Sequence, residues 1–113
     1  MSKKEEFCIM PPSPYYSTRR FAGSERNEVF GGTANRKKSI EDGLVIFLTP
    51  EDHRTGKHSF HLDPQNPRWV EVRRIAQRRW MQFYNKTEEH FIKRYGRNYL
   101  WVNIHCQNLK KTK

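Results

Sequence analysis

Residues 26–61, RNEVFGGTANRKKSIEDGLVIFLTPEDHRTGKHSFH, carry the pattern that decides the fold. NEVF is predicted to be a short strand that stops at Gly31-Gly32, because a glycine pair marks a turn. The continuous apolar run LVIFL, residues 44–48, has the length of a buried strand. The segment between them, TANRKKSIEDG, is expected to be a polar loop with a basic centre. Two short strands joined by this loop predict an antiparallel hairpin.

The residues after the second strand favour a short helix that carries a histidine in its first turn. In TPED, Thr49 can cap the helix, Pro50 suits its first position, and two acidic residues follow near the positive end of the dipole. His53 comes next, and Gly56 limits the helix to about one turn. With His58 and His61, three histidines lie within nine residues, which raises the question of a metal site.

Two further helices are predicted towards the C-terminus. The first is capped by Asn66 and opened by Pro67, and its apolar residues recur at steps of three and four: Trp69, Val72, Ile75, Ala76, Trp80 and Phe83. The second, TEEHFIKRYG, is capped by Thr87 and ended by Gly96. The following NYLWVNI is expected to be a last strand or an extended tail.

The first 25 residues are predicted to form an irregular arm, since MPPSP alone holds three of the six prolines. Tyr15, Tyr16 and Phe21 are its expected anchors on the domain. The fold class is therefore predicted to be α+β, with an arm over residues 1–25, a domain over residues 26–104 and a basic tail over residues 105–113.

The charge balance favours a polyanionic partner. The chain has 113 residues, a formal net charge of +10 and a pI near 10.0, a combination most often seen with nucleic acid as the partner. An acidic protein surface is the other candidate, and a solvated surface without such a partner is the plainest alternative. The expected phosphate contacts are Arg36, Lys37, Lys38, Arg74 and Arg78, because a basic loop or helix face can follow a backbone without reading sequence.

The cysteines and the hydropathy of the chain exclude some classes of protein. The chain has two cysteines, Cys8 and Cys106, and no C-x-x-C pair, so a four-cysteine zinc knuckle is excluded and structural zinc is not expected. Two buried thiols are preferred to a disulfide. No apolar run approaches the roughly 18 residues of a membrane span, and no secretion signal is visible. We therefore expect no membrane partner and a cytoplasmic location.

The order of these elements resembles a family of small phage-encoded HNH-type proteins. The segments that carry the resemblance are EVFGGTANRKKSIEDGLVIFLTPEDHR, AQRRW and FIKRYGRNYL, which fall within residues 26–100. The resemblance implies a small ββα-metal domain and a single-metal endonuclease that uses Mg²⁺ or Mn²⁺ in the host cytoplasm. In that design a strand supplies a general base and a ligand, the helix supplies histidines, and the cation stabilises the leaving oxygen.

The match of site residues to this family is incomplete. His53 matches the histidine of the helix, but Asn27 and Glu28 stand where the family has a His-His or His-Glu pair. Asparagine cannot take a proton from water, although its oxygen ligates weakly, whereas Glu28 could serve as base or ligand. Asp52 stands where the family has a second histidine and could also ligate. Asn35 matches the middle asparagine only loosely.

Two functions from different classes follow. In the first, the chain is a divalent-metal DNA endonuclease whose catalytic residues are Glu28, Asn27 and His53. Its metal ligands come from His53, His58, His61 and Asp52. The enzyme is expected to be weakly active or inactive, because Asn27 replaces a catalytic histidine. In the second, it is a catalytically inactive HNH-fold phage protein that inhibits a host nuclease or immune complex, for example an anti-CRISPR protein. Histidines at a solvated surface are the plainest alternative.

Overall fold

The two predicted strands pair with each other. In the computed structural model, which describes residues 6–100, β1 (Glu25–Glu28) runs antiparallel to β2 (Val45–Leu48), with Asn27 opposite Ile46. Every residue of β2 is buried, as its unbroken apolar run predicts. Among the residues described, the sheet has only these two strands, so β1 has one edge that no strand covers. The chain is thus a small α+β protein, as predicted.

The segment between the strands is a helix, and the prediction of a polar loop was wrong. Helix α1 (Gly32–Asp42) begins at Gly32, whose φ of +86° suits glycine, and ends at Gly43 in the left-handed conformation. It is polar almost all round and contacts the interior through two polar residues. The hydroxyl of buried Ser39, for example, bonds both the backbone N–H and the carbonyl of Phe30. Apolar periodicity could not reveal such a helix.

The helix after β2 is a single wide turn. The π-helix η1 (Glu51–Thr55) covers five residues and ends at Gly56, as predicted. Pro50 stands at its N-cap and not at its first position, although the Thr49 hydroxyl accepts the backbone N–H of Asp52 at 3.1 Å. The chain then folds back along η1, because the backbone N–H of Phe60 donates to the carbonyl of Asp52 and that of His61 donates to the carbonyl of His53. This return places the third histidine beside the first.

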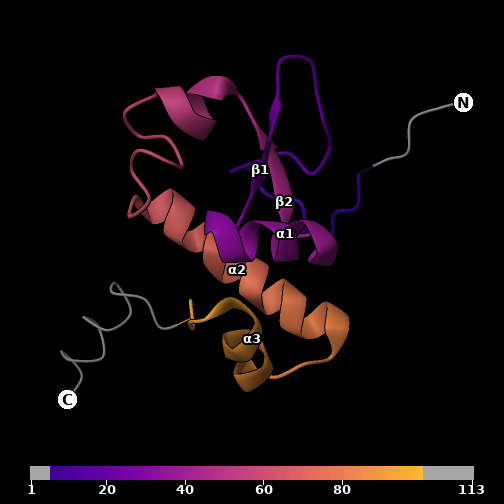
Figure 1. The fold of residues 1–113 in the computed structure, drawn as a ribbon. Helices are drawn as coiled ribbons and strands as arrows, with labels where there is room; N and C mark the ends of the chain where they lie inside the picture. The colour runs from indigo at the N-terminus through magenta and orange to yellow at the C-terminus, as the bar shows by residue number, and fades with distance from the viewer. Residues whose placement is uncertain (1–5, 101–113) are drawn as a thin grey trace, which may run out of the picture.

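Helix α2 (Pro67–Tyr84) is the long element of the fold, and in Figure 1 it runs diagonally behind α1. The Asn66 side chain accepts the N–H of Arg68, which confirms the predicted cap. Most of the predicted stripe is buried or partly buried in the core: Trp69, Val72, Ile75, Ala76 and Trp80. Phe83 is 46% exposed, contrary to the prediction, because the last turn runs past the core and places it beside exposed Phe7.

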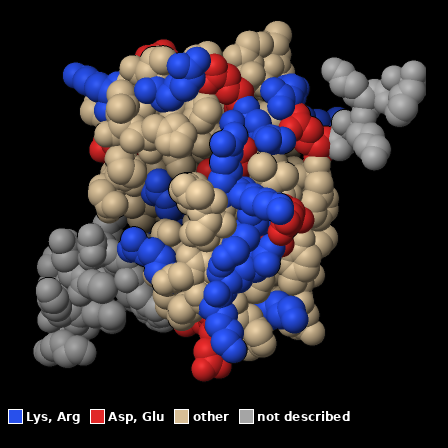
Figure 2. All heavy atoms as spheres, viewed as in Figure 1, with Lys and Arg blue, Asp and Glu red and all other residues tan. Residues whose placement is uncertain are grey.

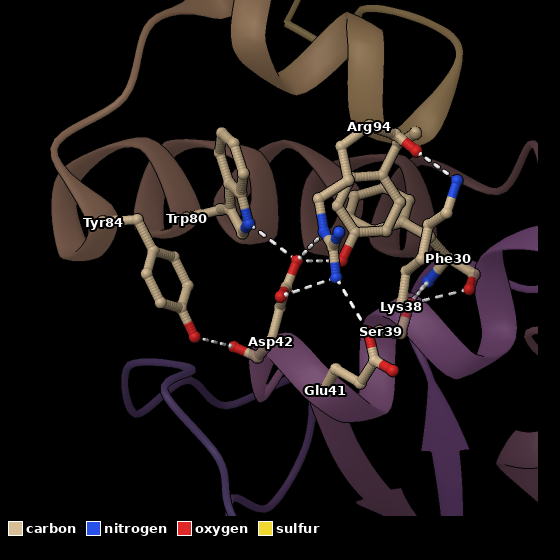
Figure 3. Close-up of polar contacts among 9 residues, drawn as sticks. Phe30, Lys38, Ser39, Glu41, Asp42, Trp80, Tyr84 and Arg94 are labelled. Carbon is tan, nitrogen blue, oxygen red and sulfur yellow. Dashed lines mark hydrogen bonds and ion pairs between the residues drawn. The ribbon is translucent and has the colours of Figure 1, made fainter.

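A buried carboxylate joins the three α-helices. Asp42, at the end of α1, accepts hydrogen bonds from the indole of Trp80 on α2 and from Arg94 and Tyr95 on α3 (Glu88–Tyr95), at 2.6–3.0 Å (Figure 3). The Asp42 backbone carbonyl also accepts from the hydroxyl of Tyr84 at 2.9 Å. Burial raises the pKa of Tyr95, and the hydrogen bond to the Asp42 carboxylate raises it further. The Tyr95 hydroxyl therefore stays protonated and remains a donor. These contacts fix α1, and with it the Gly32 end that lies next to β1.

The arm is irregular but belongs to the core. Ile9 and Met10 are buried, and the backbone N–H of Ile9 donates to the carbonyl of Gly43. Tyr16 is buried as expected, whereas Phe21 is 42% exposed and does not anchor the arm. The arm covers the edge of β2 that β1 leaves open, where Ser17 and Phe47 exchange backbone hydrogen bonds at 3.1 and 2.9 Å. Cys8 takes part in this cover, and its thiol donates to the Val45 carbonyl at 3.2 Å.

The end of the described chain follows α3. Thr87 caps this helix and Gly96 ends it, as predicted. Residues 98–100 of the expected final strand are irregular, and the rest of that segment, Cys106 and the predicted basic tail lie outside the described residues. Between residues 6 and 100, no helix is long and apolar enough to cross a membrane.

Candidate functional site

A hollow of about 480 Å³ lies where β1, the start of α1 and the returning loop after η1 meet. Its position follows from the face of β1 that carries Arg26 and Glu28 and from the loop that brings residue 61 back to residue 53. Positive side chains outnumber negative ones in its lining, which consists of Arg20, Arg26, Glu28, Gly31, Gly32, Arg36, His53 and His61. Two of the predicted catalytic residues, Glu28 and His53, therefore come together here.

Strand alternation separates Asn27 from this hollow. Arg26 and Glu28 point to the same face of β1, and the Arg26 guanidinium lies 3.2 Å from the Glu28 carboxylate. Asn27 points the other way, into the core, and is only 1% exposed. Within the part of the chain that is described, neither its amide nitrogen nor its amide oxygen has a hydrogen-bond partner. The structure thus places Asn27 beneath the sheet and outside the lining of the hollow.

Two imidazole rings lie side by side in the hollow. The ring centroids of His53 and His61 are 4.8 Å apart, and the planes are tilted by 47°. Nδ1 of His53 lies 2.8 Å from Oε1 of Glu25, so Nε2 is the ring nitrogen left for other partners. Desolvation and the neighbouring His53 lower the pKa of His61, although the charge of Glu28 opposes this and Arg73 adds to it.

The carboxylate of Glu25 organises this side of the site. Arg54 donates to both of its oxygens, at 2.9 and 2.8 Å, while His53 contacts one of them. Hydrogen bonds from Arg54, followed by that from His53, lower the pKa of Glu25 to about 2. An ionised Glu25 therefore holds η1 against the first strand at neutral pH.

The three arginines of the hollow are held by two carboxylates. Glu6 lies 2.6 Å from Arg20 and 3.2 Å from Arg26, while Glu28 lies 3.5 Å from Arg36. The Arg36 side chain is 67% exposed and the Arg20 side chain 52% exposed, so both guanidinium groups face solvent. A guanidinium has five donors, and these contacts leave several free to bind an anion.

The remaining predicted metal ligands lie elsewhere. His58 is 70% exposed and pairs with Asp63 at 3.2 Å, and Asp52 pairs with Arg68 at 3.3 Å. Over residues 6–100 no three or more His, Cys, Asp or Glu side chains are arranged to hold a metal ion. The arrangement of donors therefore does not fit the Mg²⁺ or Mn²⁺ centre that the resemblance implies, and we derive no chemical step through a metal.

The predicted phosphate contacts fall on different surfaces. Arg36 lines the hollow and Lys37 is exposed on the same helix, but the Lys38 ammonium donates to the Arg94 carbonyl at 2.7 Å. Arg74 lies on α2, pairs with Glu71 and lines a separate hollow of about 550 Å³ against the arm. Arg78 is exposed on α2. Figure 2 shows Lys and Arg side chains gathered in a band that runs over β1 and α1 towards α3.

Sequence reasoning missed Glu25, Arg20 and Arg26. Alternation along ERNE could have shown that Arg26 shares a face with Glu28, but the approach of Arg20 depends on how the arm folds. Asn35, the loosely matched middle asparagine, donates its side-chain N–H to the Tyr95 carbonyl at 3.0 Å. It therefore joins α1 to α3 and does not line the hollow.

Comparison of the chain with protein-family models, with curated proteins and with solved structures found no match. The features of the hollow that bear on function are three guanidinium groups, a pair of adjacent imidazoles and the glycine start of a helix on one concave surface.

Proposed function

We propose that the protein binds nucleic acid through the phosphate backbone, with the arginine-lined hollow at the centre of the contact surface. The observation that carries this proposal is the convergence of Arg20, Arg26 and Arg36 on one concave surface. Guanidinium groups present paired donors that match the oxygens of a phosphate. Gly31 and Gly32 lie in the same lining at the start of α1, where no side chain caps the helix and backbone N–H groups favour an anion.

The wider charge distribution supports the same function. The formal net charge of +10 attracts a polyanion, and the band of Lys and Arg in Figure 2 extends the surface beyond the hollow. Glu6 and Glu28 reduce the local positive charge, but they also hold the guanidinium groups in place before the ligand arrives. Contacts of this kind bind backbone and carry no sequence information.

The HNH-like interpretation is retained as a proposal about the frame. Its support is the order of β1, β2 and a short helix with His53 in its first turn. Two features separate this chain from a metal nuclease of that design: Asn27 is buried in the core, and Asp52 and His58 are engaged elsewhere. We therefore propose a phage-type, HNH-like nucleic-acid-binding protein whose frame does not assemble the metal-dependent centre.

A second candidate is the inhibitor of a host nuclease or immune complex. It is favoured by the same incomplete donor set, since a frame without a metal centre can still present a basic surface to an acidic partner. The two candidates differ in what the surface binds: the phosphates of nucleic acid or the carboxylates of a protein. Direct binding to isolated nucleic acid separates them.

The test is the salt dependence of binding to labelled duplex and single-stranded oligonucleotides, measured by fluorescence anisotropy. Removing one arginine–phosphate interaction should reduce the slope of log K against log salt by about 0.9 on duplex. Arg36→Glu should weaken binding and lower the slope, whereas Arg78→Glu, the matched reversal on α2, should have less effect. A larger effect of Arg78→Glu would move the contact surface to α2. Wild-type protein that binds neither oligonucleotide would leave the inhibitor as the better account.

A further inference from the structure

The paired imidazoles are not needed to bind a phosphate, because three arginines already line the hollow. His53 is only 14% exposed at its side chain, and Glu25 holds its ring from the Nδ1 side. His61 is exposed and reaches the same surface from the returning loop. The ring centroids of the two histidines are 4.8 Å apart, and one ring is fixed while the other is open to solvent. Beside the guanidinium groups, this pair is suited to proton transfer at a phosphodiester.

We propose that His53 and His61 act as an acid–base pair that cleaves RNA without a metal ion. This inference rests on the proposed function, since the strand must first bind in the hollow. The substrate class is set by chemistry. A phosphodiester whose own ribose carries a 2′-hydroxyl supplies the nucleophile, so neither an activated water nor a cation is required. DNA lacks this hydroxyl and is bound without being cut.

The step balances with the two histidines alone. Neutral His61 takes the proton of the 2′-hydroxyl while the 2′-oxygen forms a bond to the adjacent phosphorus. The bond from phosphorus to the 5′-oxygen breaks, and protonated His53 gives its Nε2 proton to that leaving oxygen. The products are a 2′,3′-cyclic phosphate and a free 5′-hydroxyl. His61 ends protonated and His53 neutral, and exchange with water returns both to their starting states.

The assignment of roles follows from the contacts of each ring. The Glu25 carboxylate engages Nδ1 of His53, which leaves Nε2 as the ring nitrogen that faces other partners. The proposed step assigns the proton of the leaving oxygen to this Nε2, which makes His53 the acid. His61 has the more exposed side chain and can approach a ribose hydroxyl, which makes it the base. Arg20, Arg26 and Arg36 would stabilise the additional negative charge on the phosphate oxygens during the step.

Glu28 has a positioning role in this account. Its carboxylate lies 3.2 Å from Arg26 and 3.5 Å from Arg36, and its side chain is only 13% exposed. It therefore sets the orientation of two phosphate-binding groups and has little room to approach a ribose. Glu28→Gln should weaken binding of the strand more than it slows cleavage of bound RNA.

The experiment uses the full chain, excess EDTA and a labelled RNA oligonucleotide, with DNA and 2′-O-methyl RNA of the same sequence as uncleavable strands. The variants are His53→Gln and His61→Gln. The matched control is His90→Gln on α3, because glutamine at that position can keep the capping box. Wild type and the control should produce 2′,3′-cyclic ends detectable by mass spectrometry. Each site variant should slow cleavage by about 10²–10⁴-fold.

Binding of the 2′-O-methyl strand, measured in parallel, separates the two proposals. His53→Gln and His61→Gln should bind this strand within about twofold of wild type, and circular dichroism should confirm that they fold. Binding without any cleavage of RNA in EDTA would overturn the acid–base pair and leave the proposed function standing. No binding of either strand would overturn both. Cleavage that requires Mg²⁺, that also cuts DNA, or that survives His61→Gln but not Glu28→Gln would contradict the assignment.

Discussion

Nδ1 of His53 lies 2.8 Å from Oε1 of Glu25, so the first strand sets the orientation of a histidine in the hollow. Arg54, the next residue of η1, binds both oxygens of the same carboxylate. A π-helix of five residues makes few contacts of its own, and this carboxylate attaches it to the sheet. The geometry of the candidate site therefore depends on one ionised side chain that sequence reasoning did not single out.

This relationship predicts a pH-dependent stability. The pKa of Glu25 is lowered from 4.5 to about 2, chiefly by the hydrogen bonds from Arg54. Because the folded-state pKa lies below the unfolded value, the stabilisation is fully present above about pH 4.5 and disappears as the pH falls towards 2. Glu25→Gln should lower the melting temperature near pH 6 and have little effect near pH 2.

The measurement is the melting temperature of wild type and Glu25→Gln at several pH values between about 2 and 6. Glu89→Gln, on the exposed surface of α3, is the matched carboxylate-to-amide control. A difference between wild type and Glu25→Gln that does not shrink on acidification would show that the ionised carboxylate is not what holds η1.

The Asp42 carboxylate should be the most sensitive polar group of the fold. It is buried and accepts from Trp80, Arg94 and Tyr95, so Asp42→Asn removes the buried one of the two carboxylates that pair with the Arg94 guanidinium. We expect a decrease of about 3 kcal/mol in the free energy of unfolding, measured by urea denaturation. Glu41→Gln, which alters only a half-exposed ion pair with the same arginine, should cost less than about 1 kcal/mol. Equal effects of the two variants would contradict the role given to Asp42.

The amide of Asn27 should be replaceable by an apolar group. Both of its polar atoms are buried without a partner among the described residues, a costly arrangement in a core. Leucine has a branched side chain similar in shape to that of asparagine, so Asn27→Leu should keep or raise the melting temperature. The increase should be about 4–8 °C for each kcal/mol added to the free energy of unfolding. Asn27→His should instead overpack the site, at about 1–3 kcal/mol, and should not create metal-dependent cleavage. A histidine variant that is stable and cuts DNA with Mg²⁺ would support the metal nuclease.

How far the sequence predicts this structure varies with the type of signal in each element. The apolar run of β2 and the three-and-four spacing of α2 predict their elements correctly, because burial selects apolar side chains at those positions. Helix α1 is not predicted because it meets the core through Ser39 and Asp42, which do not form an apolar stripe. Its ends are still marked by Gly32 and Gly43.

The candidate site is only partly predictable for a related reason. The local caps place His53 correctly, and its neighbour His61 is among the candidates because it lies close in sequence. Which of the nearby histidines reaches His53 depends on the backbone bonds that turn the loop back along η1. The position of Arg20 depends on an arm without periodicity, and no local signal could have supplied it.

The most direct test of the contact surface is an NMR titration of the labelled full chain with the 2′-O-methyl RNA strand. The signals of the backbone amides of Gly31 and Gly32 and of the side chains of His53 and His61 should show the largest chemical-shift changes. The arginine Nε–H signals of Arg20 and Arg36 should change at the same ratio of strand to protein. Shifts that instead concentrate around Arg74 and Arg78 on α2, with the glycine amides unmoved, would contradict the proposal that the hollow binds the phosphate backbone.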